Sequence, residues 1–280
     1  MDPSCLAHTL SADESRRFET DGYFVMDGVL PTPLLSRLEA AADGVYREEQ
    51  GRRGSPDGAM LNQLDFIGRD DAFLELLAYP ATFPKVWGIL GWNIQLYHSH
   101  MIITPPDPRA AGHSGRRLGW HQDTGRLNDE LEGDPRPRVS LKVAFFLSDT
   151  SVPGRGNFHV IPGSHLRNTV QFPDEARADP PDAVSVCAGA GSAVFFDRRL
   201  WHSASPNASD VTRKVLFYGY SYRWLRPRDN MTVERYLPLC DPIQRQLLGV
   251  SASGGFGYTS PSDEDVPLRA WLQARQPEAL

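Results

Sequence analysis

The stretch Asn93-Ile94-Gln95-Leu96-Tyr97-His98-Ser99-His100-Met101-Ile102-Ile103-Thr104 decides the fold class, because it is the first of five runs with strand character. The other four runs cover residues 139–147, 184–187, 192–196 and 212–224. Branched and aromatic residues dominate the runs, and turn-forming residues gather between them, as is typical of strands and their connections. Short strands joined by turn-rich segments predict a sandwich or jelly roll.

The region before these strands has helical patterning. Residues 11–14, Ser-Ala-Asp-Glu, form a capping box that predicts the start of a helix, and a short strand is expected at residues 23–26. Apolar residues at helical spacing predict a helix over residues 32–47, and residues 71–78 and 82–90 have the same character. We expect these helices to pack on the main sheet.

One domain of mainly β class with a helical annex accounts for the 280 residues. The helical part covers about residues 1–91 and the jelly-roll core about residues 92–226. A C-terminal tail over residues 227–280 ends in a short helix, which the pattern predicts at residues 267–274.

Composition excludes several classes of protein. Hydrophobic residues make up 40% of the chain and charged residues 23%, which excludes collagen-like, coiled-coil and disordered chains. The net charge of −6 argues against nucleic-acid binding, because phosphate neutralisation needs a basic surface. No apolar run is long enough to span a membrane and residues 1–10 do not resemble a secretory signal, so we expect a cytoplasmic protein. Cys5, Cys187 and Cys240 lack the spacing of a zinc site or a disulfide framework.

The motif Gly119-Trp120-His121-Gln122-Asp123 is the strongest candidate for chemistry. On a β-strand, side chains two residues apart share a face, so His121 and Asp123 would present an imidazole and a carboxylate to one metal ion. A second histidine, His202, follows the apolar strand at residues 192–196. Two histidines and one carboxylate form the facial triad of non-haem Fe(II) oxygenases, which leaves three metal positions open.

A basic residue follows the distal histidine at a suggestive distance. Arg213 lies eleven residues after His202 and shares a strand face with Val215, Phe217 and Gly219. A guanidinium inside a barrel mouth needs an anionic partner, and a dicarboxylate supplies one.

Together these residues resemble the phytanoyl-CoA dioxygenase (PhyH) family of Fe(II)- and 2-oxoglutarate-dependent oxygenases. The resemblance runs from residues 18–30, through the motif at residues 119–123 and residues 156–165, to His202 and Arg213. It implies a double-stranded β-helix, a cupin-like jelly roll. It also implies Fe(II) held by His121, Asp123 and His202, with Arg213 on the far carboxylate of 2-oxoglutarate.

The reaction that this resemblance implies consumes O2 and 2-oxoglutarate and releases succinate and CO2. A small-molecule substrate is oxidised, most often by hydroxylation, although desaturation, ring closure or epimerisation are also open. Related halogenases have a small residue where this chain has Asp123, so a halogenase is not expected.

The chain departs from the family pattern two residues after the distal histidine. Many members have a hydroxyl residue there that helps to hold 2-oxoglutarate, whereas this chain has Ala204, flanked by Ser203 and Ser205. Ser203 is the candidate for that contact. The resemblance also makes Asn62 and His100 candidate cosubstrate-binding residues.

The other chemically interesting residues have simpler explanations. His98 and His100 fit satisfied core or pocket-wall residues, and His159 and His165 fit a structural turn. Lys142 fits either an inward position beside an anion or a solvent-exposed one. Five arginines in two long loops, residues 105–118 and 124–138, fit solvated positions better than a substrate site: Arg116, Arg117, Arg126, Arg136 and Arg138.

Two other functions remain open from the sequence. The first is a cupin-like metal-dependent isomerase or hydrolase, which has no need of Arg213 or 2-oxoglutarate. The second is a non-catalytic jelly-roll binding protein that kept the barrel and lost turnover. A secondary metabolite, an amino-acid derivative or a lipid-like acid would each suit the predicted oxygenase, and the sequence specifies no oligomeric state.

Overall fold

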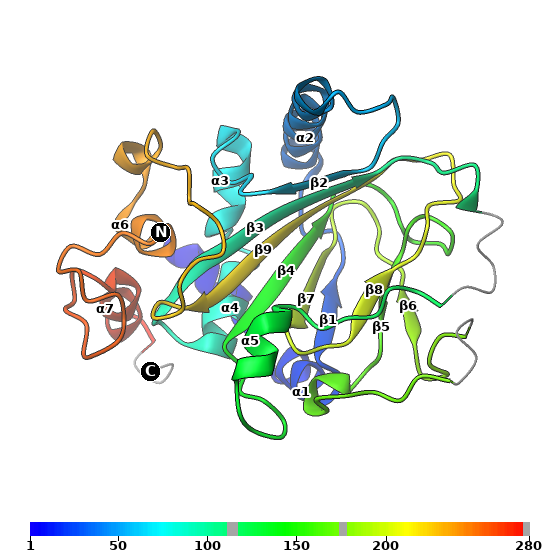
Figure 1. Ribbon diagram of the computed structural model, residues 1–280. Helices are drawn as coiled ribbons and strands as arrows, with labels where there is room; N and C mark the ends of the chain where they lie inside the picture. The colour runs from blue at the N-terminus through cyan, green and yellow to red at the C-terminus, as the bar shows by residue number, and fades with distance from the viewer. Residues whose placement is uncertain (111–116, 174–177, 277–280) are drawn as a thin grey trace.

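The computed structural model describes residues 1–110, 117–173 and 178–276. Its centre is a six-stranded antiparallel sheet, the major sheet, with strand order β1-β7-β4-β9-β3-β2. A three-stranded sheet, the minor sheet, has the order β6-β5-β8 and faces one half of the major sheet (Figure 1). The strands of the major sheet are β1 (Tyr23–Met26), β2 (Leu61–Leu64), β3 (Ile94–Thr104), β4 (Ser140–Phe146), β7 (Ala193–Asp197) and β9 (Arg213–Tyr222). Those of the minor sheet are β5 (Phe158–Val160), β6 (Val184–Val186) and β8 (His202–Ala204).

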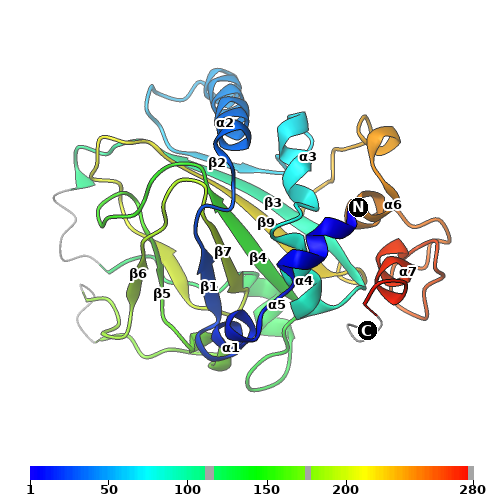
Figure 2. The ribbon, with the colours of Figure 1, turned by 180° about the vertical axis from the view of Figure 1, so that it is seen from behind.

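Helices cover the back of the major sheet, as Figure 2 shows. These are α1 (Ala12–Asp21), α2 (Thr32–Arg53), α3 (Asp71–Leu77) and α4 (Phe83–Leu90). The C-terminal helices α6 (Pro242–Leu247) and α7 (Pro267–Gln273) pack at one end of the sheet, and α5 (Gly125–Glu130) lies in front of it. Short 3-10 helices also occur in the described residues: η1 (Pro3–His8), η3 (Ser164–Leu166) and η4 (Leu237–Leu239).

Alternation along the strands produces two separate cores. On β9, Leu216, Tyr218 and Tyr220 join the large core between the sheet and the helices. Val215 and Phe217 point the other way, into a smaller core between the two sheets. Because successive strand residues face opposite sides, Arg213 shares the inner face with Val215 and Phe217, as predicted.

The predicted jelly-roll fold of mainly β class with helices on the major sheet is confirmed. The five predicted strands are β3, β4, β6, β7 and β9, each within two residues of its predicted ends. The capping box holds, since Ser11 Oγ accepts from Glu14 N and Glu14 Oε2 accepts from Ser11 N. The helix predicted over residues 32–47 continues six residues further, to Arg53, before Gly54 ends it.

Several elements have no clear sequence signal. The strands β2, β5 and β8 have four, three and three residues, too short for an alternation pattern to be recognised. The loop at residues 124–138 contains α5 instead of being wholly irregular. In the described chain, no helix is both long and apolar enough to cross a membrane. The division of the domain into three parts stays a prediction.

Gly22 ends α1 and sets the entry into β1. Its φ of 83° lies in the left-handed region, and a Cβ there would come within 2.6 Å of His165 Nδ1. We expect Gly22→Ala to lower the free energy of unfolding by about 2 kcal/mol or more, because strain and overlap add. Urea unfolding measures the loss. Gly28→Ala is the matched control, because its φ is also positive and its Cβ would meet nothing within 4 Å; an equal loss in both variants would show that overlap contributes nothing.

Candidate metal centre

The backbone brings His121 and His202 together from distant parts of the chain. His121 N donates to His202 O at 3.0 Å and His202 N donates to His121 O at 2.9 Å. These two bonds form an isolated antiparallel bridge, so residues 119–123 do not form a continuous strand. The two imidazole rings lie with their centroids 4.4 Å apart.

Hydrogen bonds fix the tautomer of both rings. His121 Nδ1 lies 2.9 Å from Gly119 O, and His202 Nδ1 lies 2.8 Å from Leu200 O. A carbonyl oxygen can only accept, so each Nδ1 must donate its hydrogen. The lone pair of each Nε2 is therefore free for a metal. Burial lowers the pKa of His202 to about 4, which keeps its ring neutral near pH 7.

The third group of the cluster is Asp123. Its Oδ1 accepts from Lys142 Nζ at 2.7 Å, whereas its Oδ2 is buried without a partner. Burial alone would raise the pKa of Asp123, but the Lys142 ammonium and the neighbouring histidines hold that pKa below its usual range. Asp123 is therefore an anion with one oxygen uncommitted. Lys142 takes the inward of its two expected positions.

These three side chains fit a divalent metal. One ligand atom from each of His121, Asp123 and His202 lies within 4.8 Å of the others. Two neutral imidazoles and one carboxylate leave the opposite side of a six-coordinate ion free, as in the Fe(II) facial triad. The unpartnered Oδ2 of Asp123 is the orphan acceptor that such an ion would satisfy.

Arg198 supports the loop that carries Asp123, a role that the sequence did not reveal. It is fully buried and donates to Thr124 Oγ1, Asn128 Oδ1 and Pro137 O. Asp123 N donates to Arg198 O at 3.0 Å. Thr124 has a φ of 59°, a strained value for a residue with a Cβ, and these contacts hold it there. An arginine in an Arg-rich chain gives no local signal of such a role.

Two adjoining cavities lie at the site, and the inner one is lined by the cluster. The inner cavity, about 310 Å³, contains the three candidate ligands together with Lys142. The outer cavity, about 920 Å³, opens beside it, and Arg213, Ile102 and Ala204 line both. Inner walls also come from Phe158, Phe196 and Phe217.

Arg213 is a buried cation without an anionic partner among the described residues. It is 2% exposed, its Nε lacks a hydrogen bond, and its guanidinium lies 5.7 Å from the centroid of the Phe146 ring. Burial lowers its pKa to about 10. An unpaired buried charge is costly, so the position suits a group that meets an anionic ligand. Gly156 makes room for it, since a Cβ there would lie 2.9 Å from Arg213 Cδ.

The other candidate cosubstrate residues fall in the same region. His100 Nε2 lies 2.7 Å from Asn62 Oδ1, so these two candidates contact each other. His100 and Ser203 line the inner cavity and Asn62 lines the outer one. Burial lowers the pKa of His100 to about 3. Ser205 lines the outer cavity, and its buried Oγ has no partner.

The remaining polar candidates are mainly structural. His98 Nδ1 lies 2.8 Å from Asp229 Oδ1, and His165 Nε2 lies 3.1 Å from Glu19 O. Arg138 bridges Glu19 and Asp197. Other loop arginines bond locally: Arg126 with Glu130 and Arg136 with Asn168, while Arg117 lies over the Phe172 ring and lines the outer cavity. Arg116 lies outside the described residues.

Comparison with known proteins gives one consistent result. Residues 18–215 match the family described as phytanoyl-CoA dioxygenase (PhyH). The chain is 26% identical over 246 residues to ectoine dioxygenase of Stutzerimonas stutzeri (strain A1501). The matched region covers 76% of this chain and 77% of that relative. The chain is 25% identical over 243 residues to L-proline trans-4-hydroxylase of Streptomyces griseoviridis, covering 75% and 85%. HygX from Streptomyces hygroscopicus, solved with nickel and 2-oxoglutarate bound, has the same fold, with a TM-score of 0.60 and 16% identity over 78% of this chain and 90% of that one.

Proposed function

Because this chain belongs to the phytanoyl-CoA dioxygenase (PhyH) family, and is an Fe(II)- and 2-oxoglutarate-dependent dioxygenase, we propose that His121, Asp123 and His202 hold its iron. The main support for this proposal is that three ligand atoms lie close together and are free to bind a metal. Two of them are the Nε2 atoms of His121 and His202, whose lone pairs are free because each Nδ1 donates to a backbone carbonyl. The substrate is a small molecule, and hydroxylation is the reaction. With the family assigned, we set aside the two alternatives that the sequence left open, a cupin-like metal-dependent isomerase or hydrolase and a non-catalytic jelly-roll binding protein.

Arg213 has the role of cosubstrate anchor in this proposal. Its guanidinium lies where the inner and outer cavities meet and has no acidic partner in the described chain. A planar guanidinium binds a carboxylate through two parallel hydrogen bonds, which orients a dicarboxylate as well as holding it. Ser203, Asn62 and His100 are the neighbouring polar groups that would complete the cosubstrate site.

Each protein group has a defined task in the reaction. A ferrous ion, when bound, supplies the O2 chemistry and the open coordination positions. The two Nδ1–H bonds orient His121 and His202, and Lys142 orients Asp123. Phe158, Phe196 and Phe217 give the inner cavity an apolar wall, which would limit the access of water to the metal. A cytoplasmic location and the use of O2 are parts of this proposal.

Release of succinate tests the function. Protein reconstituted with Fe(II) should release succinate from 2-oxoglutarate only when O2 is admitted, and faster when a panel of small metabolites contains a substrate. Mass spectrometry should find one oxygen atom added to the consumed metabolite. Consumption of a metabolite without succinate would contradict the proposed function.

Lys142 holds one oxygen of Asp123 and leaves the other to the metal. We expect Lys142→Met to bind Co(II) at least as tightly as the wild type, because a nearby positive charge is removed. We expect 2-oxoglutarate to bind about 10-fold more weakly, because a carboxylate with two free oxygens competes for the open positions. Isothermal titration measures both constants, with Lys142→Arg as the charge-conserving control. A parallel loss of metal and cosubstrate affinity would assign Lys142 a general structural role instead.

A further inference from the structure

A bulge in β3 prepares a second polar group beside the inner cavity. The pairing of β3 with β9 shifts between Leu96 and His98. Before the shift, Ile94 and Leu96 belong to the helix-side core, whereas after it Met101 and Ile103 do. The extra residue therefore turns His98 to the face that His100 shares, the face of the inner cavity.

The same bulge anchors the C-terminal segment. Tyr97 O accepts from Arg228 N at 2.8 Å and from Asp229 N at 3.4 Å. The side chain of Asp229 is 1% exposed and accepts from His98 Nδ1 at 2.8 Å, from Ser99 N and from Ser99 Oγ. A buried carboxylate with three donors is fully committed, so it cannot serve as a further ligand.

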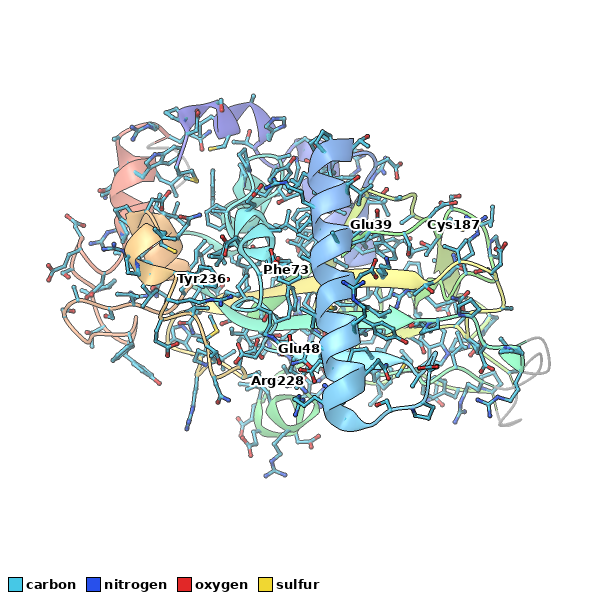
Figure 3. The ribbon with its side chains drawn as sticks, turned by 90° about the horizontal axis from the view of Figure 1, so that it is seen from above. Glu39, Glu48, Phe73, Cys187, Arg228 and Tyr236 are labelled. Atoms are coloured by element: carbon cyan, nitrogen blue, oxygen red, sulfur yellow. The ribbon has the colours of Figure 1, made fainter. Side chains whose placement is uncertain are left out.

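These bonds direct the guanidinium of Arg228. Since an ionised carboxylate only accepts, His98 Nδ1 donates to Asp229 and His98 Nε2 is left as an acceptor. Burial lowers the pKa of His98, in keeping with a neutral ring. Arg228 Nη1 lies 3.4 Å from His98 Nε2, and Arg228 lines the inner cavity together with the three candidate iron ligands. Figure 3 shows Arg228 away from Phe73, which lies on the helix-covered side.

The charges around the inner cavity favour an anionic substrate. Its described charged walls are Asp123, Lys142, Arg213 and Arg228, so cations outnumber anions. A ferrous ion and 2-oxoglutarate add equal and opposite charge. Lys142 is paired with Asp123, and Arg213 has the cosubstrate role, which leaves Arg228 without an acidic partner among the described side chains. The carboxylate of Asp229, which lies behind His98, offsets one of the positive charges of Arg213 and Arg228.

From this geometry we infer that the substrate carries a carboxylate or another oxyanion, and that Arg228, aimed by the His98–Asp229 pair, binds it. The inference rests on the proposed iron and cosubstrate sites and adds a substrate class to them. The guanidinium offers two parallel donors that match a carboxylate. His98 and Asp229 are positioning residues, because they act through Arg228.

Paired acids and amides test the inference on the full chain loaded anaerobically with Fe(II) and 2-oxoglutarate. The probes are L-proline against L-prolinamide and acetate against acetamide, and the readout is the shift of the visible charge-transfer band. The acids should bind the wild type at least about 10-fold more tightly than their amides, and Arg228→Gln should abolish the difference. Arg226→Gln should keep it, because Arg226 is exposed like Arg228 but does not line the inner cavity.

The inference would be overturned by equal binding of acids and amides by the wild type, by an acid preference that survives in Arg228→Gln, or by failure of every acid to bind. A loss of 2-oxoglutarate affinity in Arg228→Gln would also overturn it, because Arg228 would then bind the cosubstrate. If no charge-transfer band forms in the wild type, the proposed function fails instead, so the two failures are distinguishable.

His98→Gln separates positioning from direct binding. We expect this variant to lose about 3-fold in affinity for the acids, with unchanged 2-oxoglutarate affinity, because Arg228 remains and only its support is weakened. Circular dichroism checks that the variant is folded. Unchanged acid affinity in a folded His98→Gln would contradict the positioning role.

Discussion

His121→Ala should bind Fe(II) at least about 100-fold more weakly than the wild type and should release no succinate from 2-oxoglutarate. The variant removes one of three ligand atoms, and no other described histidine or carboxylate belongs to the cluster that could replace it. His121 is exposed, so its truncation leaves no core cavity and the fold should persist. Iron content after anaerobic reconstitution and desalting measures the effect, and circular dichroism verifies folding.

His159→Ala is the matched control for that experiment. His159 lies on β5, opposite Ser203 of β8, and is outside the ligand cluster. It should keep its iron, and its succinate release should stay within about 2-fold of the wild type. Stoichiometric iron in a folded His121→Ala would show that the metal lies elsewhere.

Arg213→Gln should weaken 2-oxoglutarate binding by about 100-fold while iron binding stays within about 2-fold. The side chain lies at the junction of the two cavities and makes no hydrogen bond to any of the three candidate ligands. The variant should be at least as stable as the wild type, because it removes a buried charge that has no partner in the described chain. Titration of the charge-transfer band gives the affinity, and thermal unfolding gives the stability.

Arg126→Gln controls for the loss of a positive charge. Arg126 pairs with Glu130 on the exposed face of α5 and lines neither cavity. It should leave 2-oxoglutarate affinity unchanged. If Arg213→Gln binds 2-oxoglutarate as the wild type does, Arg213 is not the anchor; if it loses iron as well, the residue maintains the whole site.

Local signals allowed much of this fold to be predicted. The capping box at Ser11 depends on neighbours within four residues, and residues 23–26 have the branched and aromatic composition of a strand; both predictions are confirmed. The end of α2 was missed because residues 47–53 are mostly charged and carry no apolar periodicity, and the helix ends instead at the left-handed Gly54. The strands β5 and β8 depend on pairing with each other across more than 40 residues, which no local pattern encodes.

In the candidate site, too, residues with a local signal were predicted and residues placed by distant contacts were missed. His121, Asp123 and His202 have residue types that suit a metal, and the structure brings them together. The Lys142 contact was one of two expectations, because β4 faces both cores and its sequence does not say which side a lysine takes. Arg228 and Asp229 were missed, since their position depends on the β3 bulge at Tyr97 and not on their own neighbours.

The absorption spectrum of the wild-type chain, loaded anaerobically with Fe(II) and then with 2-oxoglutarate, tests the iron and cosubstrate assignment most directly. A visible charge-transfer band should grow with 2-oxoglutarate to one equivalent per chain, because that band requires the cosubstrate to chelate the iron. The band should be absent in His121→Ala and should need far more 2-oxoglutarate in Arg213→Gln. Tightly bound iron without a band at saturating 2-oxoglutarate, or an undiminished band in His121→Ala, would contradict the assignment.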